Sequence, residues 1–253
     1  QHPATHWTLR LVLDLDGETI VGTRPEIGFL HTGFEKLAET LNYNKFVTLS
    51  DRMNYLSPLS NNIGYVIAVE KFLGVEITPR CAYYRVILSE LTRIADHLVC
   101  VGLAAMDVGA FTVMLYGFRE REKLYDIFEH ATGARLTTSA TRVGGMARDI
   151  PEGFDRMVEA FLAGLPKVLA DIHGLLDDNR IWQQRTRGIG RLSREDAIRY
   201  GVTGPLLRAS GQKWDLRRDR PYLVYPELDF DVITDEACDC EGRYRVRMGE
   251  IDQ

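Results

Sequence analysis

The histidines near the start of the chain are the first side chains that could do chemistry. His2 and His6 stand four residues apart in the string QHPATH. On a helix this spacing would point both rings at one metal ion, but Pro3 and the strand-like pattern that follows favour a loop. We therefore predict no metal site in this chain, and two solvent-facing or hydrogen-bonding histidines are the simpler interpretation.

Asp107 is the second candidate, because it is the only charged residue between Leu98 and Phe118. The run approaches the ~20 residues that a bilayer-spanning helix needs. Its glycines and its central carboxylate instead favour two buried helical segments joined at a bend. A buried, unpaired carboxylate costs about 3 to 5 kcal/mol, so we expect Asp107 to have a partner. A helix cap or backbone amides would satisfy it. His6 is the alternative, and a carboxylate favours the protonated form of an imidazole, which can donate a proton.

The string DRMNYLSP at 51–58 places Arg52 and Tyr55 just before a predicted helix. A lone tyrosine is usually a packing residue whose hydroxyl reaches water, and Arg52 could equally form a surface ion pair. His31 lies between Gly28 and Gly33, a spacing that suits a loop in close approach to another surface. Taken singly, none of these three side chains identifies a function.

The composition sets the class of protein. The chain has 253 residues, of which 45% are apolar and 26% charged, and these values are typical of a globular chain and exclude disorder and collagen. The formal net charge of −5 gives no electrostatic reason to expect nucleic acid binding. The 4 cysteines form no Cys-x-x-Cys pair and are too scattered for a disulfide scaffold, which indicates a reducing compartment. The chain begins at Gln1 without a secretion signal, and we expect it to be trimmed or fragmentary.

The elements that must position these side chains are mostly helices. Alternating leucines from Leu9 to Leu15, followed by Asp16 and Gly17, predict an N-terminal β-hairpin. Helical periodicity with start and stop residues follows along most of the chain. The first predicted helices are an apolar stripe at 34–41, a segment that ends at Gly74 and a long helix that begins at Pro79. Further helices are predicted at about 112–133, at 152–176 and between Ser193 and Gly201, and the one at 152–176 is expected to be kinked or split at Pro166. A short strand is predicted at 228–232, and the charged run 120–123 is expected to be solvated surface.

Eight strings of the sequence, in order, resemble the D-type subunit of respiratory complex I, the proton-translocating NADH-quinone oxidoreductase, whose mitochondrial equivalent is the 49 kDa subunit. They are QHPATH at 1–6, IGFLHTGFEK at 27–36, DRMNYLSP at 51–58, AVEKFLG at 68–74, GFREREKLYDIFEHATGAR at 117–135, RVGGMARDIP at 142–151, NRIWQQRTRGIG at 179–190 and LRASGQKWDLRRDRPY at 207–222. Together they span nearly the whole chain, and eight ordered matches are not expected by chance.

The resemblance implies an α+β fold similar to that of the large subunit of nickel-iron hydrogenases, with a mainly helical core joined to a small N-terminal antiparallel β-sheet. We expect residues 1–30 to form the hairpin region with the quinone-site loop, 31–200 the helical core, and 201–253 a loop-rich part that is truncated relative to the family. Hydrogenases hold their metal with two Cys-x-x-Cys pairs, whereas here Cys238 and Cys240 have the wrong spacing. Nickel-iron centres need soft thiolates, so a hydrogenase-like metal enzyme is the less favoured alternative.

The resemblance also implies that the quinone headgroup binds between His6 and Tyr55, with Asp107 as the acidic partner of His6. Reduction of a quinone to a quinol adds two electrons and two protons, so both carbonyl oxygens need hydrogen-bond donors. An imidazolium and a phenol are such donors. Asn54 departs from the family, in which aspartate is common at this position.

The remaining implications concern cofactors and partners. His2, His31 and Arg52 match family positions that support the quinone site near the terminal 4Fe-4S cluster of a neighbouring subunit. This chain alone is expected to bind no cofactor; quinone (ubiquinone or menaquinone) is its substrate, and NADH and FMN bind elsewhere in the complex. The implied partners are the other complex I subunits, above all the one carrying the terminal cluster, the C-type subunit and the membrane-arm subunit at the quinone entrance. The implied location is peripheral, on the cytoplasmic face of a bacterial inner membrane or the matrix face of a mitochondrial one. A scaffold subunit that only packs between partners is the third interpretation.

Overall fold

A computed structural model describes residues 9–253, so His2 and His6 lie outside the described residues. The chain divides into two compact units, residues 1–42 and 43–253. The described residues are mostly helical and contain two small antiparallel sheets of two strands each. The predicted mainly helical fold with a small antiparallel sheet is confirmed at this level.

The first unit contains the predicted hairpin. Strand β1 (Arg10–Asp16) pairs antiparallel with β2 (Thr19–Glu26), and Gly17 turns the chain at a φ of 60°. Arg10 and Glu26 are paired across the ladder, and Arg10 Nη1 lies 3.3 Å from Glu26 Oε2. Because side chains alternate along a strand, Leu11 and Leu13 share one face, and both are exposed. A short helix, α1 (Phe34–Ala38), follows and has no buried residue.

The second unit holds most of the secondary structure. Its elements are α2 (Tyr43–Ser50), α3 (Pro58–Leu73), α4 (Pro79–Asp107), α5 (Phe111–Thr132), β3 (Thr141–Arg142), β4 (Gly145–Met146), α6 (Phe154–Leu176), α7 (Arg180–Thr186), α8 (Arg194–Arg199), α9 (Gly204–Arg208), α10 (Leu216–Asp219), the 3-10 helix η2 (Tyr225–Glu227) and α11 (Cys240–Asp252). The predicted start and stop residues are confirmed: Gly74 ends α3 in the left-handed conformation, Pro79 opens α4, and the Ser193 hydroxyl caps α8.

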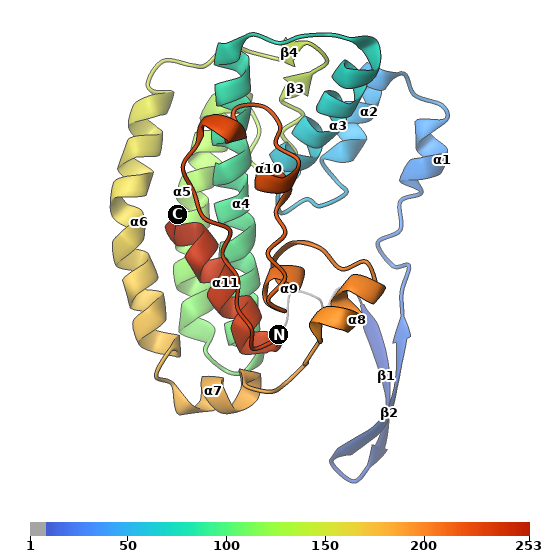
Figure 1. The fold of residues 1–253 in the computed structure, drawn as a ribbon, viewed down its shortest axis with the longest axis vertical. Coiled ribbons are helices and arrows are strands. Elements are labelled where there is room, and N and C mark those ends of the chain that lie inside the picture. The colour runs from blue at the N-terminus through green and yellow to red at the C-terminus, as the bar shows by residue number, and fades with distance from the viewer. Residues whose placement is uncertain (1–8) are drawn as a thin grey trace. The chain divides into compact units, whose positions relative to one another are not determined.

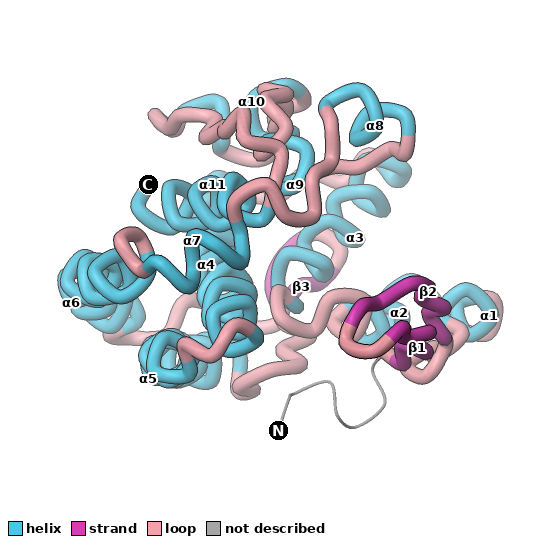
Figure 2. The backbone as a smooth tube through the Cα atoms, turned by 90° about the horizontal axis from the view of Figure 1, so that it is seen from below, coloured by secondary structure: helices cyan, strands magenta, loops and turns pink. Residues whose placement is uncertain are grey.

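The core of this unit is built around α4. This helix packs against α3, α5 and α11, and α5 packs against α6 (Figure 1). Figure 2 shows α4, α5 and α6 beside one another and seen nearly along their axes. Their inward faces form one apolar cluster, whose members include Leu88, Leu91, Leu98, Leu124, Phe128, Phe161 and Leu169. The amphipathic periodicity read from the sequence is therefore realised as a helical bundle.

The predicted bend in the uncharged run is confirmed. Helix α4 ends at Asp107 and α5 begins at Phe111, while Gly109 between them has a φ of 97° that favours glycine. No helix of the described residues is long and apolar enough to cross a membrane.

Two other glycines of this run allow α4 and α5 to approach closely. A Cβ added to Gly102 would lie 3.1 Å from the Cα of Met114. A Cβ added to Gly117 would lie 3.0 Å from the carbonyl oxygen of Leu98. Any larger residue at these positions would push the helices apart.

The expectation that 120–123 is solvated surface is wrong for two of its residues. Glu120 is 0% exposed and Arg121 is 3% exposed. The Glu120 carboxylate accepts hydrogen bonds from Arg119 Nε (2.9 Å) and Lys123 Nζ (2.5 Å), whose side chains remain about half exposed. Because α5 packs between α4 and α6, charged residues on its sides are covered while their neighbours reach water.

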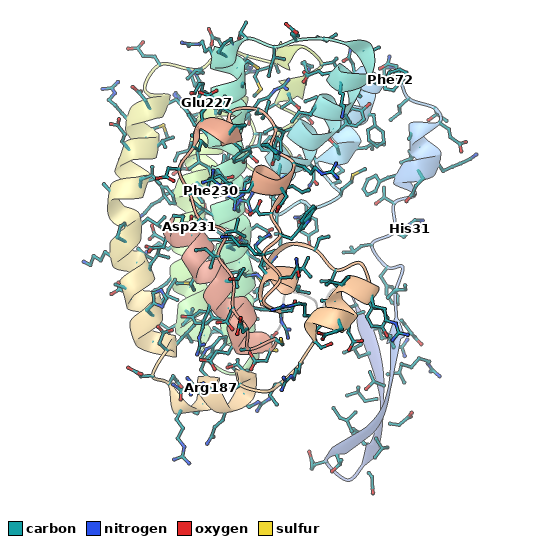
Figure 3. The ribbon with its side chains drawn as sticks, in the orientation of Figure 1. His31, Phe72, Arg187, Glu227, Phe230 and Asp231 are labelled. Carbon is teal, nitrogen blue, oxygen red and sulfur yellow. The ribbon has the colours of Figure 1, made fainter. Side chains whose placement is uncertain are left out.

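The predicted strand at 228–232 is also wrong, because this segment is irregular. The ring of Phe230 instead packs edge-on near Tyr225, with ring centroids 6.2 Å apart, and lies under the guanidinium groups of Arg217 and Arg218, at 4.5 and 4.0 Å. Figure 3 labels Phe230 in the segment between η2 and α11. Phe230 thus packs by stacking on arginine and not by strand pairing. Helix α6 is continuous through Pro166 and is not split there.

Candidate functional site

Tyr55 lies in the turn at residues 51–57 that joins α2 to α3. Its side chain is 45% exposed. Within the part of the chain that the structure describes, its hydroxyl makes no hydrogen bond. The phenol can therefore donate a hydrogen bond to a ligand without first breaking one to those residues.

The backbone on either side of Tyr55 is held by amide side chains. Asn54 Nδ2 donates to Ser57 Oγ (2.6 Å), and the Ser57 backbone N–H donates to the Asn54 carbonyl (3.0 Å). Asn61 Nδ2 also donates to the Asn54 carbonyl, at 3.0 Å. Beneath them, Asn62 Nδ2 donates to the Val47 carbonyl (3.2 Å) and ties α3 to α2. Asn54 thus stabilises the turn through its amide donor.

Asp51 begins the same turn and is fully buried, at 0% exposed. The Ser139 backbone N–H lies 3.1 Å from each of its carboxylate oxygens, and the Ser139 hydroxyl donates a further hydrogen bond. The Thr138 hydroxyl contributes a longer one of 3.5 Å. No arginine, lysine or histidine of residues 9–253 forms an ion pair with this carboxylate, so its charge is compensated by hydrogen-bond donors.

The β3–β4 hairpin that follows Ser139 is held at its other end by a buried ion pair. Arg85 on α4 bonds both carboxylate oxygens of Glu70 on α3, at 2.8 and 2.7 Å. Arg85 also donates to the carbonyls of Arg142 (3.1 Å) and Gly145 (3.0 Å), and Glu70 accepts from the Gly144 backbone N–H (2.8 Å). The fork of a guanidinium suits such bidentate pairing.

The prediction that Asp107 is buried is wrong. Asp107 is the last residue of α4 and its side chain is exposed, while Ala105, two residues earlier, is fully buried in the core. The chain turns at Gly109 immediately afterwards, so the position belongs to a helix end and not to a helix interior. The uncharged run from Leu98 to Phe118 therefore contains a turn at the surface, and Asp107 lies at that turn.

Two neighbouring cavities, one near Asp107 and one near Ser57, share wall residues of α4 and α11. Asp107 lines a cavity of about 340 Å³ whose other walls include Val101, Trp182 and Leu206. Ser57 of the Tyr55 turn lines a second cavity of about 280 Å³. Cys100 and Arg247 belong to the walls of both. Asp107 and Ser57 of the Tyr55 turn therefore line neighbouring cavities along α4.

His97, which lines the second of these cavities, is a buried histidine that the sequence alone did not identify as a candidate. His97 Nε2 lies 2.8 Å from Glu250 Oε2, and Arg208 on α9 bonds the other carboxylate oxygen through Nε (2.7 Å) and Nη2 (2.6 Å). Burial lowers the pKa of His97, although the hydrogen bond that Glu250 accepts from it acts in the opposite direction. Burial raises the pKa of Glu250, but the hydrogen bond to His97 and the charge of Arg208 outweigh it and hold that pKa below its usual range. Only an unusual histidine inside an apolar helix could have signalled this site, since its partner lies 153 residues away.

Of the remaining predicted residues, Arg52 lies in the Tyr55 turn and His31 in the first unit. Arg52 is exposed, and its guanidinium donates to the Thr48 carbonyl of α2. His31 belongs to the first unit, between β2 and α1, where it is exposed and its backbone N–H donates to the Gly28 carbonyl at 3.0 Å (Figure 3). The convergence of His6 with Tyr55 and Asp107, and the supporting roles of His2, His31 and Arg52, stay predictions.

The side chains that could ligate a metal are dispersed. Among residues 9–253, no group of three or more histidine, cysteine, aspartate or glutamate side chains is placed to hold a metal ion. The cysteines in this range are all free, at positions 81, 100, 238 and 240.

Comparison with known proteins places this chain among relatives of one kind. It is 52% identical over 251 residues to the D-type subunit of NADH-quinone oxidoreductase from Geotalea uraniireducens, with 99% of this chain and 64% of the relative covered. It is 54% identical over 250 residues to the second D-type subunit of NADH-quinone oxidoreductase from Roseiflexus sp., with 99% and 60% covered. The chain thus spans under two thirds of the length of these relatives. Residues 107–253 match the family described as respiratory-chain NADH dehydrogenase, 49 Kd subunit. This chain belongs to that 49 kDa subunit family of the respiratory-chain NADH dehydrogenase.

Proposed function

We propose that this chain forms the quinone headgroup site of a proton-translocating NADH-quinone oxidoreductase. The observation that carries the proposal is the identity of about half of all residues, over nearly the whole chain, with relatives that are D-type subunits of NADH-quinone oxidoreductase. The exposed phenol of Tyr55 on a braced turn adds a suitable donor.

Reduction of the quinone needs electrons, protons and a hydrogen-bond donor at each carbonyl oxygen. A quinone that takes up two electrons and two protons becomes a quinol. The electrons would come from a 4Fe-4S cluster of a neighbouring subunit, supplied by NADH through FMN elsewhere in the complex. The two protons would come from the solvent by way of the hydrogen-bond donors at the carbonyl oxygens. Tyr55 donates a hydrogen bond to one carbonyl oxygen as negative charge develops there, and His6, backed by Asp107, donates to the other. Arg52, His2 and His31 support this site. Reduction is coupled to proton translocation.

Substitution of the two donors tests the proposal. In membranes that carry the variant in the native gene, Tyr55→Phe and His6→Ala should each lower NADH-to-quinone turnover at least about tenfold, because removal of one transition-state donor typically has an effect of this size or larger. NADH-to-ferricyanide activity, which is measured upstream, should stay unchanged. Tyr200→Phe is the matched control, since Tyr200 is 76% exposed and lies on another helix end. Full quinone turnover in both donor variants would remove the assigned roles.

A photoreactive quinone analogue separates this proposal from a scaffold role. Label should be recovered in peptides that contain His6 or Tyr55. Label confined to other subunits would favour a chain that only packs between partners.

We further propose that the helical core is related in fold to the large subunit of nickel-iron hydrogenases, with the metal cavity replaced by a quinone cavity. The absence of a Cys-x-x-Cys pair from these 253 residues supports the replacement of the metal, because nickel-iron centres need soft thiolates. Nickel present in stoichiometric amount in the purified complex would instead favour a hydrogenase-like metal enzyme.

The partners proposed for this chain are the subunit with the terminal 4Fe-4S cluster, the C-type subunit and the membrane-arm subunit at the quinone entrance. A quinone tail comes from the bilayer, and docking on a membrane subunit would bring it to this chain. We place the chain peripherally, on the cytoplasmic side in a bacterium or the matrix side in a mitochondrion.

A further inference from the structure

Asp51 combines two features that call for an explanation. Its carboxylate is 0% exposed, yet it has no ion-pair partner among residues 9–253. A buried charge is strongly unfavourable unless hydrogen bonds compensate it, and here the compensation comes from Ser139 and Thr138, more than 80 residues away.

The acceptor side of this contact is the start of the Tyr55 turn. The donor side is the segment that leads into the β3–β4 hairpin, which Glu70 and Arg85 hold from the other end. Ser139 has a φ of 42°, in the left-handed region that non-glycine residues rarely adopt. This conformation accompanies the approach of its N–H to both Asp51 oxygens, 3.1 Å each.

Tyr55 itself depends on its backbone for position. Its ring is 45% exposed and its hydroxyl makes no hydrogen bond to the described residues. The turn is braced after Tyr55 by Ser57 and Asn61 and before it by Asp51. We infer that Asp51 is a positioning residue, which acts through Ser139 to fix the turn that presents the Tyr55 phenol to quinone. This inference rests on the proposed function.

A double-mutant cycle in the assembled enzyme tests it. Asp51→Asn keeps the volume but removes the charge that Ser139 solvates, and it should lower kcat/KM for quinone about tenfold, since a misplacement of about 1 Å can reduce a rate by up to ~100-fold. In a Tyr55→Phe background the same change should lower kcat/KM less than about twofold, because the hydroxyl that Asp51 positions is already gone. Ser139→Ala should show a smaller effect with the same dependence on Tyr55, while NADH-to-ferricyanide activity stays unchanged.

Glu70→Gln is the matched control, because Glu70 is also a buried carboxylate that holds the same hairpin but does not belong to the Tyr55 turn. Any effect of Glu70→Gln on quinone turnover should be the same with and without the Tyr55 hydroxyl. Equal effects of Asp51→Asn in both backgrounds would overturn the inference and leave Asp51 a purely structural residue. Loss of activity from Tyr55→Phe together with equal Asp51 effects would reject the inference alone, whereas full activity of Tyr55→Phe would reject the role of Tyr55 in the proposed function.

Discussion

Two buried ionic clusters lie along α4, and they differ in how completely they are closed. Near the start of the helix, both terminal nitrogens of Arg85 and both oxygens of Glu70 have partners, among them carbonyl and amide groups of the β3–β4 hairpin. Only the buried Nε of Arg85 lacks a partner in this cluster among the described residues. Farther along, the Glu250 carboxylate is bonded by His97 and Arg208, but His97 also lines the 280 Å³ cavity. Arg247 in the same cavity wall has no carboxylate within ion-pair distance among the described residues.

The difference separates two uses of buried charge. A cluster that is enclosed by three segments fixes the geometry of those segments. A cluster that lines a cavity can change its protonation or its solvation without disturbing the fold. The first therefore holds the β3–β4 hairpin in place, and the second is where pH and ligands can act.

The largest effect is expected when the closed cluster is broken. Arg85→Met leaves Glu70 buried without its cation and should reduce the free energy of unfolding by about 3 to 5 kcal/mol. Arg80→Met on the same helix is the control, because its ion pair with Asp149 is exposed and worth at most about 1 kcal/mol. Chemical denaturation measures both. A loss below about 1 kcal/mol for Arg85→Met would show that the cluster does not hold the hairpin.

A smaller effect is expected at the open cluster. Glu250→Gln keeps the shape but removes the charge that pairs with Arg208, and charge-assisted hydrogen bonds are worth about 1.5 to 3 kcal/mol. We expect a loss in that range by thermal or chemical denaturation. Asp252→Asn, at an exposed position of the same helix, should change stability by less than about 0.5 kcal/mol. Equal losses in the two variants would contradict the assigned contribution of Glu250.

The pH dependence of stability sharpens the comparison further. The pKa of His97 is lowered by burial from its usual 6.5, so the unfolded chain takes up a proton near that pH before the folded one does. His97 should therefore reduce stability as the pH falls below about 6.5, by at most about 1.4 kcal/mol per pH unit. The lowered pKa of Glu250 adds a loss of the same sign at more acidic pH. Denaturation midpoints between pH 7.5 and 5 should fall less in His97→Gln than in the natural chain, and parallel curves would contradict this.

The smallest effect is expected from Arg247, the arginine of this cavity wall that forms no ion pair with a carboxylate of residues 9–253. Its half-buried guanidinium donates to the Arg243 carbonyl at 3.1 Å, and Arg247→Gln removes this cation. The free energy of unfolding should change by no more than about 0.5 kcal/mol. The charge of Arg247 helps to lower the pKa of His97, so the substitution should raise that pKa. NMR titration of the His97 ring would record this shift, and an unchanged titration would place Arg247 outside the cluster.

Local chemistry made much of the fold predictable. Pro79, Gly74 and Ser193 mark helix ends through constraints that act within one turn of the chain, and Asp16 with Gly17 marks the hairpin. The predictions of burial and secondary structure were wrong where packing against an element distant in the sequence determines the environment of a residue. The charged neighbours of Glu120 predict an exposed side chain, but Glu120 is buried because α5 packs between two helices.

The same division applies to the candidate site. The Tyr55 turn was predicted from its position ahead of Pro58, whereas the contact between Asp51 and Ser139 spans 88 residues and has no local signal. The burial of Asp107 was predicted from uncharged neighbours and failed, because a helix end can expose a residue regardless of the hydropathy around it. Pairings between remote ionisable groups, such as His97 with Glu250, need the tertiary structure.

The exposed leucines of the β1–β2 hairpin have a practical consequence for work with the isolated polypeptide. A two-stranded ribbon is only marginally stable by itself, and Leu11, Leu13 and Leu15 leave apolar groups in contact with water. Such groups favour association between copies in dilute buffer. Purification of this chain should accordingly yield monodisperse material only with mild detergent or co-expressed neighbouring subunits.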